Sequence, residues 1–261
     1  MTALADVSAL INRATGGSSG TPELIAFFKD ARIVGAASPA TIAGRLHSLW
    51  TYDGIPSAGV APGSTWLNPT NATTGGLKQA DPGGGREKFL TYASLAASVA
   101  GTGKLYDRLG HRSGLSGTTT GAQTITSATI TRNTGGVGNR ILVEIFTQIG
   151  TTATTITASY TNQAGTTGQT TPTIAIGGTG NREQTLAFLL PLAAGDTGVQ
   201  AIASITLAAS TTTAGDIGVS IIRPLGIDIG CPLLGVGNEI SAISKGRGPI
   251  TIDTDACQGL L

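Results

Sequence analysis

The sequence has few of the residues on which charged interfaces and membrane anchors depend. Of its 261 residues only 12% are charged, and the formal net charge is +1, whereas about 25% of the residues in an average soluble domain are charged. No cluster of lysine or arginine occurs, so we expect no direct nucleic-acid binding. No apolar run reaches the roughly 18 residues of a membrane-spanning helix, so we expect no membrane contact. Residues 1–16 lack the basic start and continuous apolar stretch of a secretion signal, which predicts synthesis in the cytoplasm.

Cysteine and histidine are equally scarce. The two cysteines, Cys231 and Cys257, are too few for a disulfide framework. Two free, half-buried thiols are expected in a reducing compartment, and one late disulfide between them is the alternative. The two histidines, His47 and His111, are 64 positions apart and have no cysteine at metal-ligand spacing. The sequence therefore predicts no zinc site and no cofactor.

Glycine and threonine take the place of the missing charges. The chain contains 39 glycines and 40 threonines, while aromatic residues make up only 4%. A surface poor in lysine and glutamate must be covered by threonine, serine, glycine and alanine. β-Branched threonine suits the solvent face of a strand. This composition is typical of neutral β-structure, and it suits a protein that is packed against neighbours.

From about residue 117 onward, apolar residues recur with a period of two. In 140–149, Ile141, Val143 and Ile145 share one face, and Glu144 lies on the other. Similar alternation marks 154–161, 186–192, 199–207 and 216–224, with glycine-rich turns between them. In 199–207 the expected inward residues are Val199, Ala201, Ala203, Ile205 and Leu207. Seven or eight strands at this spacing predict an antiparallel β-sandwich or jelly roll over 117–230.

The remaining regions are less regular. Residues 1–34 read as an N-terminal arm of two short helices, 2–14 and 22–32. Residues 35–116 are irregular and rich in glycine and proline, with one helix expected from about Gly85 to Ala100. Residues 231–261 read as an extended arm that ends in a strand at 248–254. Lysine, which often protects exposed strand edges, is absent from 105–244. We therefore expect arms or other subunits to cover the edges, which favours an oligomer.

The helical arm and both tryptophans are candidates for contacts with a partner. An amphipathic arm docks either on its own domain or on a neighbouring subunit. Tryptophan either closes a small core or anchors an interface, where it is enriched. The interface hypothesis rests on seven residues: Leu10, Ile11, Leu24, Phe27, Phe28, Trp50 and Trp66.

The stretch LYDRLGHRSGLSG, residues 105–117, contains the three residue types of a hydrolytic triad. An enzymatic interpretation makes His111 a base, Ser113 or Ser116 the nucleophile, and Asp107 the group that orients the histidine. However, Gly114–Thr118 lacks the glycine spacing of a nucleophile elbow, and a strand follows it where that motif requires a helix. We therefore expect a polar loop with Asp107 paired to Arg108 or Arg112, and no enzymatic activity.

The tail holds the other candidate for chemistry. Asp253 and Asp255 alternate in IDTDAC and could hold a calcium ion together with backbone carbonyls. A solvated face is the expected role of a single alternating acid pair.

Residues 104–125, KLYDRLGHRSGLSGTTTGAQTI, followed by 140–165, resemble virion structural proteins of tailed bacteriophages. In that family a phrase of the type LYDRL…SGLSGT…QT leads into a β-sandwich rich in threonine and glycine. The matching residues are Leu105, Tyr106, Asp107, Arg108, Leu109, Ser113, Gly114, Leu115, Ser116, Gly117, Thr118, Gln123 and Thr124. The similarity is clear over about 104–165 and weaker through about 230. It implies no catalytic residues.

The resemblance implies a component of the phage particle, and a capsid-bound decoration or cement protein is the first interpretation. Such a protein contacts the major capsid protein and further copies of itself, commonly as a trimer. A tail, neck or baseplate protein would have the same composition. A host-binding β-sandwich module is a third alternative, although few aromatic residues are present to stack on sugars.

Overall fold

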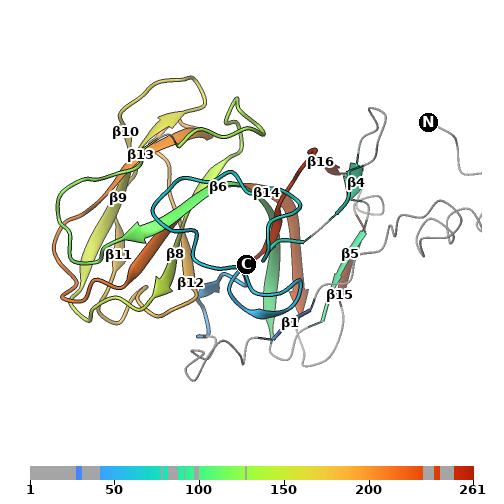
Figure 1. The fold of residues 1–261 in the computed structure, drawn as a ribbon, viewed down its shortest axis with the longest axis horizontal. Helices are drawn as coiled ribbons and strands as arrows, with labels where there is room; N and C mark the ends of the chain where they lie inside the picture. The colour runs from blue at the N-terminus through green and yellow to red at the C-terminus, as the bar shows by residue number, and fades with distance from the viewer. Residues whose placement is uncertain are drawn as a thin grey trace, which may run out of the picture.

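The computed structural model describes residues 28–30, 42–77, 79–81, 88–90, 92–96, 100–126, 128–231, 238–241 and 250–261. This part of the chain consists of strands and loops and contains no helix. Two antiparallel sheets pack face to face as a β-sandwich (Figure 1). The expected class, mainly β with an antiparallel sandwich, is therefore confirmed.

The larger sheet has six strands, and two of them are unusually long. Its order is β17 (Gln258–Leu260), β6 (Gly101–Leu115), β14 (Asp216–Cys231), β8 (Arg140–Thr147), β12 (Leu186–Leu190) and β2 (Leu46–His47). The 15-residue β6 and the 16-residue β14 run antiparallel at its centre. Both strands continue past the sandwich, toward the right-hand side of Figure 1.

The smaller sheet has five short or medium strands. Its order is β10 (Gln169–Thr170), β9 (Thr154–Asn162), β13 (Val199–Leu207) and β7 (Gln123–Thr124), and β11 (Ile174–Ile176) also pairs with β9. The central pair β9–β13 contains two register shifts, between Val199 and Ala201 and between Ile202 and Ser204. Both edges are formed by strands of only two or three residues, which leaves little unpaired backbone.

The main core lies between the two sheets. The alternation expected in β9 is observed, because Ile156, Ala158 and Tyr160 are buried there. In β13 the expected alternation is wrong in part: Ile202 is 1% exposed and Ala203 is exposed. The two register shifts are the cause, since a bulge changes which residues of a strand face inward.

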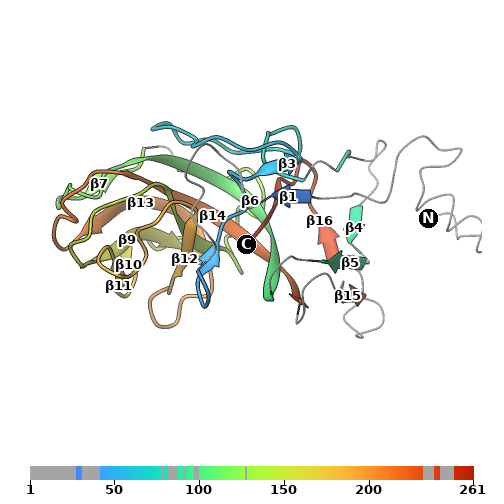
Figure 2. The ribbon, with the colours of Figure 1, turned by 90° about the horizontal axis from the view of Figure 1, so that it is seen from below.

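A third layer covers the outer face of the larger sheet. Residues 42–77, which we call the cover, begin with β2 at the edge of this sheet, and much of the segment then runs along the side that faces away from β9 and β13 (Figure 2). The cover includes β2 and β3 (Asp53–Ile55), and β3 pairs with β1 (Phe28–Asp30). Its irregular course agrees with the expectation for this region. The helix expected over 22–32 is wrong at residues 28–30, which form β1.

A second, smaller cluster lies beside the extension of β6 and β14. Two strand pairs flank it, β4 (Lys88–Leu90) with β16 (Ile250–Ile252) and β5 (Tyr92–Leu95) with β15 (Asn238–Ser241). The helix expected from Gly85 to Ala100 is therefore wrong over 88–90 and 92–95. Pairing with the distant C-terminal strands overrides the local helical preference of this alanine-rich stretch. The cluster contains Leu105, Leu225, Ile227, Ile229, Ile252 and Ala256.

The outer edge of β6 is closed by other parts of the same chain. β17 pairs with one half of β6, and in the other half Leu67 exchanges two backbone hydrogen bonds of 2.9 Å with His111. The tail thus provides β16 within the expected strand 248–254 and a further strand, β17, that sequence analysis missed. At this edge the expected protection is intramolecular.

Candidate functional site

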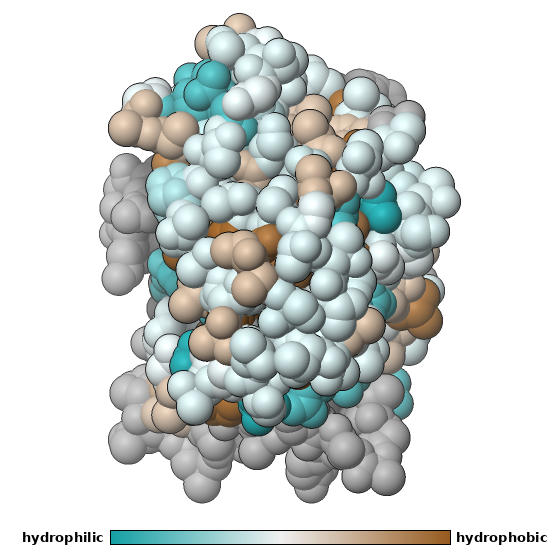
Figure 3. All heavy atoms as spheres, turned by 90° about the vertical axis from the view of Figure 1, so that its left-hand side faces the viewer, coloured by the Kyte–Doolittle hydropathy of each residue, from teal (hydrophilic) through white to brown (hydrophobic). Residues whose placement is uncertain are grey.

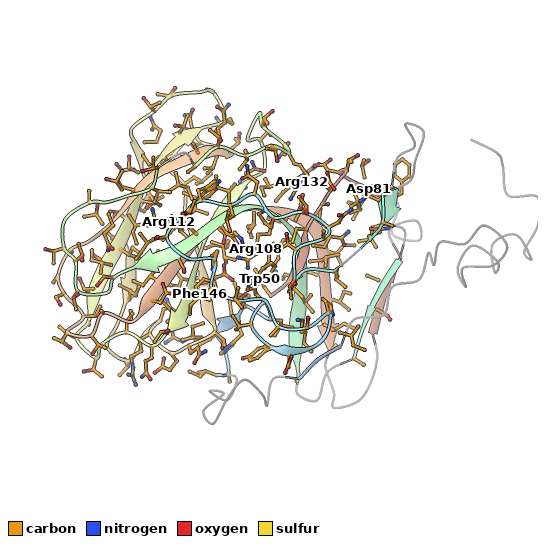
Figure 4. The ribbon with its side chains drawn as sticks, viewed as in Figure 1. Trp50, Asp81, Arg108, Arg112, Arg132 and Phe146 are labelled. Carbon is orange, nitrogen blue, oxygen red and sulfur yellow. The ribbon has the colours of Figure 1, made fainter. Side chains whose placement is uncertain are left out.

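The triad-like segment is a strand, so the expectation of a polar loop is wrong. Residues 105–115 form most of β6, and all of them except Gly114 are buried. Leu109 belongs to the core of the sandwich, whereas Arg108 lies beside Trp50 of the cover (Figure 4). His111 contacts the same tryptophan. Charged side chains tolerate this burial only if each one finds partners.

Arg108 and Glu144 form a fully buried ion pair at the centre of this face. Arg108 Nη2 donates to Glu144 Oε1 at 2.6 Å, and Nη1 donates to Oε2 at 2.7 Å. The two side chains are 0% and 2% exposed. Ser48 of the cover donates to Oε1 at 2.6 Å, and Ser220 of β14 donates to Oε2 at 2.9 Å. Glu144 does face away from Val143 and Ile145, as expected, but the cover encloses it.

The pair is held in its charged form. Burial opposes the charge of Arg108, but Glu144 and Tyr106 more than offset this effect and raise the pKa of Arg108. Burial alone would raise the pKa of Glu144, yet Arg108 and the hydroxyls of Ser48 and Ser220 lower it overall. Burial raises the pKa of Tyr106, whose hydroxyl accepts from Arg108, to about 12.

Trp50 closes the site from the side of the cover. Its ring centre is 4.3 Å from Arg108 Cζ, which is a cation–π contact, and its ring meets His111 edge to face at 5.4 Å. Trp50 Nε1 donates to the carbonyl of Val60 at 3.0 Å. The indole is 3% exposed and clusters with Phe146 and Cys257. Trp50 therefore closes a small core within its own chain.

A second buried ion pair ties four segments together. Arg132 donates to both carboxylate oxygens of Asp107, at 3.0 and 3.1 Å, and to the carbonyl of Pro69 in the cover at 2.9 Å. The backbone N–H of Cys257 in the tail donates to Asp107 at 2.9 Å. Burial raises the pKa of Asp107, and the contacts with Arg132 oppose this rise.

The expected pairing of Asp107 with Arg108 or Arg112 is wrong. Arg108 pairs with Glu144 instead. Neighbouring side chains of a strand point to opposite faces, which separates Asp107 from Arg108. Arg112 donates to the carbonyls of Ser113 and Thr124.

The described residues do not assemble a catalytic triad. Burial, followed by the charge of Arg108, lowers the pKa of His111 to about 3, so the ring is neutral and enclosed. Ser113 Oγ accepts from the backbone of Gly63, and Ser116 Oγ lies 2.8 Å from Thr118 Oγ1. Within the described part of the chain, no hydrogen bond joins His111 to either serine or to Asp107. The site is a set of buried ion pairs and hydrogen bonds that join β6 to the cover, the tail and the neighbouring strands.

The structure places only some of the proposed interface residues. Trp66 is 9% exposed, belongs to the main core and donates from Nε1 to the carbonyl of Thr129. Both tryptophans are thus occupied within their own chain. Phe28 lies in β1, and Leu10, Ile11, Leu24 and Phe27 lie outside the described residues. Contact of these seven residues with a partner stays a prediction.

The structure also places the tail acids and the two cysteines. Asp253 pairs with Arg223 at 2.9 Å on the rim of a shallow hollow of about 410 Å³, which Asp255 also lines. Among the described residues, no group of three or more histidine, cysteine or acidic side chains is placed to hold a metal ion. Cys231 and Cys257 are free and buried, more deeply than expected, and the alternative of a disulfide is wrong.

The comparisons with known proteins identify no family. No protein-family model and no curated protein matches the chain. One similar solved structure is the family 11 carbohydrate-binding module of the cellulosomal cellulase Lic26A-Cel5E of Clostridium thermocellum. The match has 11% sequence identity and a TM-score of 0.19, and it covers 54% of this chain and 95% of the module. A likeness this distant carries no argument about function. In the described part of the chain, no helix has the length and hydropathy to cross a membrane.

Proposed function

We propose that this chain is a structural component of a tailed-bacteriophage particle, and specifically a capsid-bound decoration or cement protein that stabilises the head. In this proposal the sandwich is of the jelly-roll type and the protein is not an enzyme. Its partners are the major capsid protein and copies of itself, assembled as a trimer. It is made in the cytoplasm of the bacterial host and resides in the virion, without binding nucleic acid or membrane.

The observation that carries the proposal is the absence of charged residues from the strands of the smaller sheet. The five strands of the smaller sheet contain no aspartate, glutamate, lysine, arginine or histidine. Their outer face carries hydroxyls in register: Ser204 lies opposite Ser159, with Thr124 and Thr170 on the flanking strands. The side of the molecule that carries β9 and β13 is accordingly mostly pale in Figure 3, between hydrophilic and hydrophobic.

Such a face suits contact with a neighbouring protein. Interface centres are depleted of charged residues, because a buried charge loses its hydration and needs a partner. A surface covered by threonine and serine avoids this penalty. Many weak contacts of this kind can add up to stable attachment when several copies bind one lattice.

The buried ion pairs on β6 support a structural role for the segment that resembles phage proteins. Arg108 and Asp107, both part of the matching phrase, connect this strand to the cover and the tail. These contacts join the cover and the tail to one strand of the larger sheet. A rigid block of this kind can bear load without any reactive group.

The test is the mass of the purified full chain in solution, followed by its binding to assembled heads that lack it. We expect a trimer that binds such heads and raises their melting temperature. Binding to isolated tails, necks or baseplates, with no effect on heads, would replace the head assignment with the tail alternative. Retention on a host glycan without binding to any particle component would favour the host-binding module.

A further inference from the structure

The only two histidines of the chain both lie at the contact between the cover and the larger sheet. His111 on β6 is 3% exposed, and His47 on β2 is 8% exposed. The contact that each ring makes requires a nitrogen without a proton. Two of the groups at this contact therefore have an ordinary pKa, about 6.5, that lies close to neutrality.

His111 is enclosed next to a cation. Arg108 Nη1 lies 3.4 Å from His111 Nδ1, and because a guanidinium can only donate, Nδ1 must be the acceptor. Trp50, which belongs to the cover, contacts the imidazole ring of His111 edge to face. A proton on Nδ1 would place two donors and two positive charges against each other, in a site where both side chains are almost fully buried.

His47, at the edge of the sheet, also accepts a hydrogen bond on one ring nitrogen. The backbone N–H of Ile42 donates to His47 Nε2 at 3.0 Å, and Nδ1 lies 3.1 Å from Thr185 Oγ1. Tyr52 of the cover also meets that hydroxyl, at 3.0 Å. Burial lowers the pKa of His47.

We propose that the cover is an acid-released layer: protonation of His111, assisted by His47, detaches residues 42–60 from the larger sheet while the sandwich stays folded. Opening moves Trp50 away from His111 and admits water to the imidazole. The newly formed cation is then hydrated instead of facing Arg108 in a dry site. The sandwich core keeps its contacts, because it lies on the opposite face of the sheet.

The charged and titratable groups around His111 come from three elements. Arg108, on β6 itself, opposes protonation, and Glu144 on β8 favours it. Cys257 in the tail clusters with Trp50, and burial holds its pKa at about 11, so the thiol is neutral throughout the acid range. The balance therefore disfavours a charged His111 as long as the cover is closed.

The expected effect at pH 5 follows from the difference in proton uptake. The closed state has a His111 pKa of about 3, and the open state is expected near the ordinary value of about 6.5. Proton uptake at pH 5 then favours opening by about 30-fold relative to pH 7.5. His47 acts in the same direction.

Hydrogen–deuterium exchange of the full chain at pH 7.5 and pH 5.0, corrected for intrinsic exchange rates, tests the proposal. We expect the opening constant of peptides within 42–60 to rise about 30-fold, while β9 and β13 stay the most protected segments. His111→Gln should remove most of this rise, because glutamine takes up no proton. His47→Gln, the matched control, should leave the larger part in place.

Two results would overturn the proposal. One is an opening constant that changes less than about 3-fold between the two pH values. The other is loss of protection in the cover and in β9 and β13 in a single step. Should a variant fail to fold, the unmodified chain still decides, because its own exchange within 42–60 must rise between pH 7.5 and pH 5.0 while β9 and β13 stay protected.

Discussion

Replacing Glu144 by glutamine should remove a large part of the stability of this protein. The substitution keeps the volume of the side chain but removes the charge that Arg108 faces at 2.6 and 2.7 Å. Arg108 is 0% exposed, so its charge is left buried without a counterion. Removing one partner of a buried pair costs about 3–5 kcal/mol. That is a substantial share of the roughly 5–15 kcal/mol that stabilise a typical domain.

Urea unfolding, followed by tryptophan fluorescence and circular dichroism, measures this loss. Asp228→Asn is the matched control, since Lys104 and Asp228 form an ion pair at 2.7 Å with side chains that are 45% and 58% exposed. An exposed pair of this kind contributes about 0–1 kcal/mol. A loss below about 1 kcal/mol for Glu144→Gln would refute the reasoning, because the buried pair would then behave like the exposed one.

Three further predictions concern packing, thiol access and pH. Gly110→Ala should destabilise the fold by about 1–3 kcal/mol in urea unfolding, because the new Cβ would overlap the ring of Trp66, whereas Gly121→Ala meets open space and should be neutral. Cys257 should resist thiol reagents until the chain unfolds, because burial raises its pKa to about 11; modification at the rate of a free thiol in the native state would contradict this. The folded-state pKa of His111, about 3, lies below its unfolded value, so stability should fall with pH, by about 2 kcal/mol from pH 7.5 to 5, and His111→Gln should remove most of this loss in urea unfolding at the two pH values.

The strands of the sandwich could be predicted because the alternation of apolar and polar residues lies within the sequence of each strand. Alternation of apolar and polar residues is set by the pleat of a strand, so β9 and β12 follow directly from their sequences. β13 departs from its pattern because its bulges depend on the neighbouring strand. The stretch Lys88–Leu95 departs further, since its strands pair with residues about 150 positions away in the sequence. Local propensity carries no information about such partners.

The buried ion pair of Arg108 and Glu144 could be predicted only in outline. A glutamate in the middle of the apolar strand RILVEIFTQI and an arginine in LYDRL are unusual enough to mark two positions that need partners. Sequence alone does not reveal that β14 separates their strands, that Ser220 lies between them, or that Ser48 and Trp50 close the site from above. The segment that looks most like an active site holds its polar residues for the opposite reason. Most of them are buried because they join β6 to the cover, to the tail or to a neighbouring strand.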